Sequence, residues 1–296
     1  MAKKLLNLKN DYVFKRIFGY IGNENITKDF LDSILLDEKI TNVKLNNSPI
    51  LEKDLLNDKM GIIDINAQIN DEISCDIELQ VVDNKNIEKR ALFYWSKLFI
   101  KNIKEGDDYD KLRKTVVILI LDYNIQVTED IPKYITNWKP REEDFTQKIL
   151  TPVAEIYIIE LRKFKKYQQN TKYKALNSWI KFIESPGDID MSTEKNVAIK
   201  EAKKELEKIS SDEHEEYLAH LRQKYIMDAK SFEDTGYDKG LKQGIKQGIE
   251  QERANRNIEI ARNLKSQNVD INIIVKATGL SEKQIKNLWL LIKFKF

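Results

Sequence analysis

The chain has 296 residues, of which 41% are apolar and 33% are charged, and its formal net charge is +2. This length allows one core of about 150 residues plus one or two smaller units. The small net charge excludes electrostatic steering of the whole molecule toward nucleic acid, so any basic site must be local. Residues 236–296 contain twelve Lys or Arg against six Asp or Glu, which makes this tail the predicted basic part.

The cysteine content and the hydropathy pattern indicate the cellular compartment in which the protein is expected. Cys75 is the one cysteine, which excludes an intrachain disulfide and a cysteine metal cluster and favours a reducing compartment. Polar residues interrupt the first apolar residues before a signal-peptide core forms, and the longest apolar run, 116–121, is too short to cross a membrane. We therefore expect a cytoplasmic protein without a membrane partner.

The first predicted elements are two helices and a hairpin. Apolar residues at helical spacing predict helices over 11–18 and 25–36, separated by a Gly-Tyr-Ile-Gly-Asn break. The period then changes to two, with apolar and polar residues alternating through 63–69 and again through 73–81. This pattern predicts a β-hairpin with one apolar face.

Further elements complete an α/β sandwich, followed by helix with little else. Helical spacing returns over 87–104, and apolar strands are predicted at 115–121 and 153–161. Short helices are expected at 258–264, 271–277 and 282–292, with Gly279 ending the second and Ser281 capping the third. The predicted divisions are an α/β domain at 1–165, a charged helical region at 166–235, a glycine-repeat helix at 236–255 and a helix-turn-helix-like tail at 256–296.

The register of the hairpin decides which carboxylates meet. A three-residue loop at 70–72 places Asp64 opposite Glu78, whereas a five-residue loop places it opposite Gln80. Opposed carboxylates repel unless a cation bridges them, and oxygen ligands with open positions suit Mg²⁺ or Mn²⁺. Such an ion lowers the pKa of bound water and stabilises charge on a phosphate. The alternative is that these polar residues form only the solvated face of an amphipathic hairpin.

Several segments resemble the recombination-promoting nucleases and PD-(D/E)xK nuclease family transposases. The glycine repeat and the Thr278-Gly279-Leu280-Ser281 segment are also typical of that group. The matching segments are Asn-Asp-Tyr-Val-Phe-Lys-Arg-Ile-Phe-Gly at 10–19, Ile-Asp-Ile-Asn-Ala at 63–67, Ile-Glu-Leu-Gln at 77–80 and Arg-Ala-Leu-Phe-Tyr at 90–94. The resemblance implies a restriction-endonuclease-like α/β core with an all-helical C-terminal region, and divalent-metal-dependent cleavage of DNA with little sequence preference.

The resemblance assigns Asp64 and Glu78 as metal ligands, and one neighbouring position departs from the wider superfamily. The superfamily places a lysine two residues after the glutamate, where this chain has Gln80. Lys59 and Lys15 are candidates to supply the missing positive charge, although either can be an ordinary surface lysine. Asp11 either has the acidic role that the superfamily places on its first helix or is only a helix-start carboxylate.

Candidate DNA-binding side chains lie on two predicted helices. Arg90 and Tyr94 are one helical turn apart and can reach the same side of the site, with Arg90 on a phosphate. Tyr94 can equally be a core residue. Lys283 and Lys286 lie on the last predicted helix, where a helix-turn-helix would place them near a DNA backbone.

Two functions fit these features. The first is a DNA endonuclease linked to recombination, mobile elements or defence, and the second is a catalytically weak relative that binds DNA or other copies of itself. Glycines recur at every fourth residue from 236 to 248, beside an apolar row at the same spacing. The rows predict a homo-oligomer, with a dimer favoured, because helices can approach closely along them. The alternative is a loose linker that arose by repeat expansion.

Overall fold

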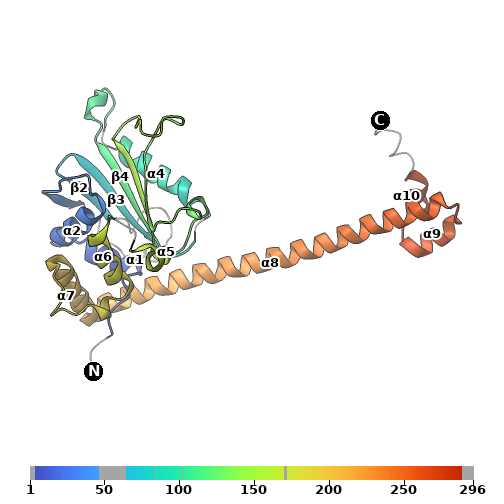
Figure 1. Cartoon of the computed structure of the whole chain (residues 1–296). Coiled ribbons are helices and arrows are strands. Elements are labelled where there is room, and N and C mark those ends of the chain that lie inside the picture. The colour runs from blue at the N-terminus through green and yellow to red at the C-terminus, as the bar shows by residue number, and fades with distance from the viewer. Residues whose placement is uncertain (1–3, 47–64, 84, 102, 170–171, 289–296) are drawn as a thin grey trace. The chain divides into compact units, whose positions relative to one another are not determined.

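A computed structural model of the chain (Figure 1) describes residues 4–46, 65–83, 85–101, 103–169 and 172–288. Asp64 and Lys59, two of the predicted site residues, lie outside the described residues. The chain divides into two compact units, Met1–Ala229 and Lys230–Phe296.

The first unit is built on a six-stranded mixed sheet with the strand order β1-β2-β3-β4-β6-β5. Strands β3, β4 and β6 are parallel neighbours, and the pairs β1–β2, β2–β3 and β5–β6 are antiparallel. The strands are β1 (Val43–Asn46), β2 (Ile65–Ile69), β3 (Ile73–Gln80), β4 (Lys114–Leu121), β5 (Ile135–Trp138) and β6 (Ala154–Glu160). The structure thus adds β1 and β5, which are too short for a clear period in the sequence.

Helices cover both faces of this sheet, with α4 on one side and α1, α2 and α6 on the other (Figure 1). The central strand β4 is apolar along both faces, and its residues divide between the two cores accordingly. The helices of this unit are α1 (Asp11–Phe18), α2 (Glu24–Ile34), α4 (Ile87–Ile100), α5 (Leu161–Tyr167), α6 (Lys174–Glu184), α7 (Val197–Ser211) and the first turns of α8 (Glu213–Ser266), with short 3₁₀ turns at Tyr109–Lys111, Gln126–Thr128 and Pro186–Asp188. The predicted α/β sandwich is confirmed.

The hairpin between β2 and β3 has the register of a three-residue loop. Ile69 pairs with Ile73 and Ile65 pairs with Ile77. Asn70 and Asp71 make the turn with positive φ angles of 52° and 61°, a conformation that Asn and Asp tolerate better than other side chains. The same Asn70 bonds to the backbone of residues 39, 41 and 42, which ties the turn to the chain leading into β1.

The alternative interpretation of the hairpin, in which its polar residues form only a solvated face, does not hold for β3. Ser74, Asp76 and Glu78 are only 8%, 5% and 3% exposed. Helix α4 packs on this side of β3 and β4, so the alternating pattern reports two chemically different buried faces. A buried carboxylate is costly without charged or hydrogen-bonding partners, which makes this face the place to look for a site.

The second unit contains the rest of α8 together with α9 (Ile271–Thr278) and α10 (Glu282–Asn287). The predicted helix at 258–264 is not separate, because it continues α8. Gly279 ends α9 in the left-handed conformation, and Ser281 caps α10 in a reciprocal capping box with Gln284. The small apolar core of this unit is formed by Ala261, Ile274, Ile285 and Leu288.

Candidate active site

Glu78 is the centre of a polar cluster on the α4 side of the sheet. It lies on β3 two residues before the strand ends, at the carboxyl edge of the parallel strands β3, β4 and β6. Its Oε1 accepts a hydrogen bond from Nη2 of Arg90 at 2.8 Å and another from the side-chain amide of Gln80. A buried carboxylate thus shares one oxygen between a cation and an amide.

Helix α4 supplies two side chains to this cluster. Nη2 of Arg90 also donates to the hydroxyl of Tyr94 at 2.8 Å, and the guanidinium lies 5.5 Å from the centre of the Tyr94 ring. The two residues are four apart, so they lie on one face of the helix. Tyr94 is 5% exposed and belongs to the core between α4 and the sheet, so its ring packs while its hydroxyl contacts Arg90.

Helix α1 approaches the hairpin through a glycine. A Cβ added to Gly19 would lie 3.0 Å from Cγ1 of Ile65 and 3.0 Å from the carbonyl oxygen of Lys15. The end of α1 therefore packs directly on the first described residue of β2, which follows Asp64 in the sequence. Lys15 is 6% exposed, so it is not one of the solvated surface lysines.

Asp11 has a different set of contacts from Glu78. Both of its carboxylate oxygens accept hydrogen bonds from Arg222, at distances from 2.6 to 3.0 Å. The cap of α1 is Asn10, whose side chain accepts from the backbone of residues 12 and 13. Arg222 was missed in the sequence because 211 residues separate it from Asp11 and its helix shows only a run of mixed charge.

The remaining predicted residues lie elsewhere. Lys283 and Lys286 are on α10 in the second unit, where Lys286 forms an exposed ion pair with Glu282 at 3.0 Å. Cys75, on the apolar face of β3, is buried, and burial raises the pKa of its thiol well above the usual range. It is therefore an unreactive core residue.

The oxygen donors at the end of β3 fit a hard divalent cation, because carboxylate and amide oxygens are the ligands that Mg²⁺ prefers. Among the described residues, no three His, Cys, Asp or Glu side chains gather closely enough to hold a metal. A metal ion at Glu78 would thus need further ligands besides the described carboxylates. Asp64, the other predicted ligand, lies outside the described residues.

The mixed sheet, the helices on both faces and the buried glutamate at the end of a parallel strand fit an α/β nuclease-like fold. The sequence matches the family described as PD-(D/E)XK nuclease family transposase over residues 8–236, and the chain belongs to this family. The match includes Glu78, Gln80, Arg90 and the signature segment of α1. No curated protein and no solved structure matches the chain significantly.

Within the part of the chain that the structure describes, no helix is both long enough and apolar enough to span a bilayer.

Proposed function

We propose that the protein is a divalent-metal-dependent DNA endonuclease with low sequence specificity that acts in recombination, in mobile elements or in defence. The observation that carries the proposal is the Glu78 cluster, in which a buried carboxylate lies 2.8 Å from Arg90 at the carboxyl edge of the parallel strands. In a chain of this family, that edge is where hydrolysis of a phosphodiester would take place. The lone cysteine favours a cytoplasmic location.

Glu78 and Asp64 are the proposed ligands for Mg²⁺ or Mn²⁺. The described register supports the pair, because Asp64 directly precedes Ile65 in the sequence, and the partner of Ile65 directly precedes Glu78. When bound, the ion would lower the pKa of a water molecule and stabilise negative charge on the phosphate.

The other side chains have proposed roles as binding or positioning groups. Arg90, oriented by Tyr94, would bind a phosphate of the DNA backbone, because a guanidinium can hold two phosphate oxygens. Gln80 positions Glu78 through its amide. Lys15 and Lys59 remain the candidates for the positive charge that a lysine at position 80 would have supplied.

The alternative function is that of a catalytically weak relative that binds DNA or other copies of itself. Two observations favour it, namely Gln80 in place of a lysine and the ion pair that already neutralises Glu78. The C-terminal unit would serve either function, with Lys283 and Lys286 contacting a DNA backbone and the glycine row of α8 joining two copies.

The test is cleavage of supercoiled plasmid by the purified full chain with Mg²⁺ or Mn²⁺, against an EDTA control. We expect nicked and linear plasmid only with the metal, and no cleavage by Asp64→Ala or Glu78→Ala. Asp32→Ala is a matched control, because its carboxylate forms a surface ion pair with Lys28. Binding of the plasmid without cleavage under every metal condition would support the catalytically weak relative. Equal cleavage by both site variants and the parent would show that the proposed site is wrong.

A further inference from the structure

The first unit, Met1–Ala229, carries a basic surface that its overall charge conceals. Helix α5, with the sequence Leu-Arg-Lys-Phe-Lys-Lys-Tyr, has four Lys or Arg in seven residues and no acidic residue. Lys163 is buried and neutralised, because it bonds to Glu160 at 3.0 Å and to the hydroxyl of Thr128. The side chains of Arg162, Lys165 and Lys166 are exposed. One buried lysine therefore fixes the helix while three cations face outward.

Two hollows flank this helix and share Tyr167. The first, of about 400 Å³, is lined by α5 and the loop after β4, and the second, of about 540 Å³, runs along the edge strand β5. Each has one acidic residue in its lining, Glu129 in the first and Asp37 in the second. The basic residues of the two linings are Arg162, Lys163, Lys166, Lys133, Lys139, Arg141 and Lys172.

Two of these cations form ion pairs with described carboxylates, Lys163 with Glu160 and Lys139 with Glu155 at 2.9 Å. The other five form no ion pair with a carboxylate of the described residues. Lys166 and Lys172 lie over the rings of Tyr167 and Tyr173, at 5.0 and 5.5 Å from the ring centres, which holds their stems along the surface while the charge stays accessible. The linings of the two hollows therefore carry a surplus of positive charge, even after the buried carboxylates of Glu160 and Glu155 neutralise Lys163 and Lys139.

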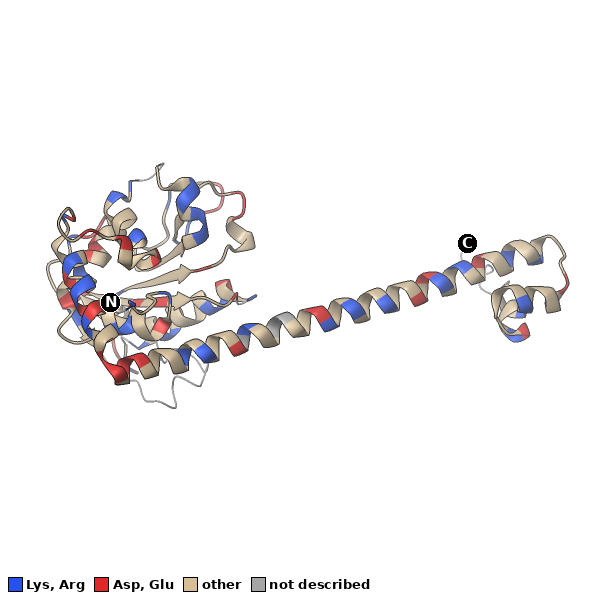
Figure 2. Ribbon diagram, turned by 90° about the horizontal axis from the view of Figure 1, so that it is seen from below, with Lys and Arg blue, Asp and Glu red and all other residues tan. Residues whose placement is uncertain are grey.

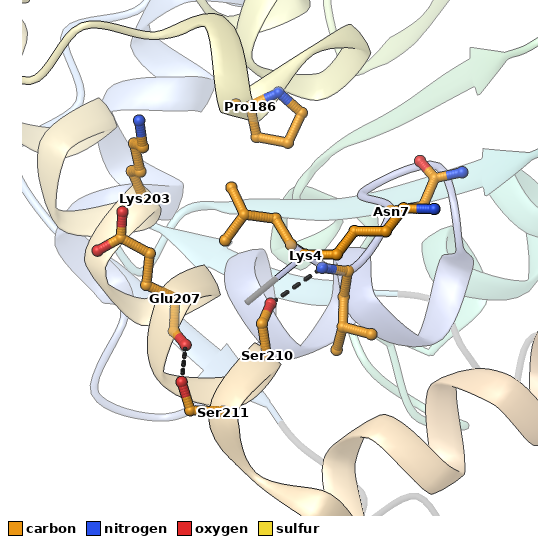
Figure 3. A pocket seen from close by; sticks show the side chains of 10 residues that line it. Lys4, Asn7, Pro186, Lys203, Glu207, Ser210 and Ser211 are labelled. Atoms are coloured by element: carbon orange, nitrogen blue, oxygen red, sulfur yellow. Dashed lines mark hydrogen bonds between the residues drawn. The ribbon is translucent and has the colours of Figure 1, made fainter. Parts of the chain in front are cut away.

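A comparable hollow of about 660 Å³ beside α7 has a different character (Figure 3). It combines Lys4 and Lys203 with Glu207, and Lys203 is bonded to the carbonyl oxygen of Ile189. The Ser210 hydroxyl accepts a hydrogen bond from the backbone N–H of Leu6 at 2.9 Å, so the wall of this hollow is a packing contact between the N-terminal segment and α7. The surplus of cations is a feature of the α5 and β5 hollows.

The basic surface begins at the same sheet edge as the Glu78 cluster. Gln80 pairs in register with Leu121, and Leu121 pairs with Glu160, the residue directly before α5. Two strand spacings of about 4.8 Å each separate the ends of β3 and β6, so α5 starts on the order of 10 Å from the end of β3. Successive phosphates of one DNA strand are separated by a smaller distance, so one duplex can contact both places.

We propose that the surface formed by α5 and the β5 edge binds the phosphate backbone of duplex DNA beside the cleavage site. The inference rests on the proposed function for the identity of the ligand, and on the charge surplus and the shared sheet edge for its location. Arg162 and Lys166 hold the phosphates nearest to the site, and Lys133, Arg141 and Lys172 hold those further along β5. Basic groups at such a surface give affinity without reading the base sequence.

The test compares two double charge reversals in the full chain, Arg162→Glu/Lys166→Glu and Lys195→Glu/Lys204→Glu. The second pair is the matched control, because it makes the same change in net charge with two exposed lysines at and near α7. Binding of a fluorescein-labelled 30-base-pair duplex is measured by anisotropy in EDTA at several salt concentrations. We expect the first variant to bind the duplex at least tenfold more weakly than the control variant. The slope of its log K against log salt should be less steep by about 2, because two phosphate contacts are lost.

Equal affinity and equal salt slope for the two variants would overturn the proposal, provided that circular dichroism shows both to be folded. The pair Lys133→Glu/Lys172→Glu repeats the comparison on β5, away from the buried Lys163. Because EDTA removes catalysis from the measurement, the result is independent of the nuclease test. If the protein binds DNA through α5 but never cleaves it, the proposed endonuclease activity is wrong and the proposed DNA-binding surface is supported.

Discussion

Asp11 and Arg222 form a two-pronged ion pair that joins α1 to the first turns of α8. The Arg222 side chain is 7% exposed and that of Asp11 is 12% exposed, so solvent screens the pair little. The neighbouring signature residues contact the same helix, since Tyr12 and Arg16 both bond to Glu215 and Asn10 bonds to the carbonyl oxygen of Ala219. The polar residues of segment 10–19 thus hold the first turns of α8 within the first unit.

Asp11→Asn should destabilise the protein while leaving cleavage by the folded molecules near the parent level. The change removes the carboxylate charge that faces the buried Arg222 guanidinium, and loss of one partner of such a pair costs about 3 kcal/mol of unfolding free energy. Urea denaturation measures the loss, and Asp11→Asn combined with Arg222→Met should recover part of it. Asp32→Asn, at a surface pair, should cost less than about 1 kcal/mol. Loss of cleavage with unchanged stability would instead make Asp11 a catalytic acid.

Gln80→Lys should keep or raise cleavage, because an ammonium group at this position can still donate to Glu78 and restores the superfamily pattern. Gln80→Ala removes the donor to a buried carboxylate oxygen, so cleavage should fall about tenfold, the equivalent of one hydrogen bond of about 1.4 kcal/mol. Rates of plasmid nicking at fixed Mg²⁺ compare the three proteins. If the alanine variant is as active as the parent, Gln80 is a spectator.

The signal in the sequence was strongest where a local rule decides the structure. The apolar alternation predicted that apolar residues of the two hairpin strands face each other and left loops of three or five residues open, and the structure has the three-residue loop, with Ile65 opposite Ile77. The spacing of Arg90 and Tyr94 likewise predicted one helical face, and in the structure Arg90 donates to both Glu78 and the hydroxyl of Tyr94.

The contacts that escaped prediction depend on the meeting of distant segments. The burial of Asp76 and Glu78 depends on α4 crossing their face of the sheet, which alternation alone does not reveal. The basic surface at α5 was missed because the chain before residue 236 has a negative net charge. The run of four Lys or Arg without an acidic residue at 161–167 could nevertheless have indicated it.

Stability should fall in acid because of Glu155, a buried residue at the amino end of β6. Burial alone would raise the pKa of Glu155, yet hydrogen bonds from Lys114 at 2.6 Å and from Lys139 outweigh it and hold the pKa below the ordinary 4.5. A depressed folded-state pKa stabilises the protein above the unfolded-state value, and this stability is lost as pH falls through the folded-state value. The loss should therefore begin below about pH 4.5.

Glu155→Gln isolates this contribution. At pH 7 the variant should be less stable by about 2 kcal/mol, since it loses charged hydrogen bonds, and the difference from the parent should shrink as pH falls below 4. Thermal unfolding across pH 3 to 7 measures both proteins. A constant difference at every pH would contradict the assignment.

Helix α8 contains a row of four glycines whose open side no described residue of the chain fills. A Cβ added at any of these positions would meet no atom within 4 Å outside the neighbouring helix backbone, and the adjoining apolar residues are at least 50% exposed. Charges of both signs follow the helix (Figure 2), so no single charge pattern opposes association. The glycines are Gly236, Gly240, Gly244 and Gly248, and the apolar residues are Leu241, Ile245 and Ile249.

Replacing all four glycines with alanine should therefore convert a dimer into a smaller species. Glycine in a helix costs about 1 kcal/mol relative to alanine, so the row costs about 4 kcal/mol that close packing with a second copy would offset. The added methyl groups would stabilise α8 as an isolated helix and would block the approach of a second copy. The thermal stability of α8 should therefore rise while the subunit number falls. Light scattering should report a dimer for the parent and for the control Gln243→Ala/Gln247→Ala/Gln251→Ala, and a monomer for the glycine variant and for a chain lacking residues 231–296. The same subunit number in all four proteins would leave the row as a costly linker with no role in assembly.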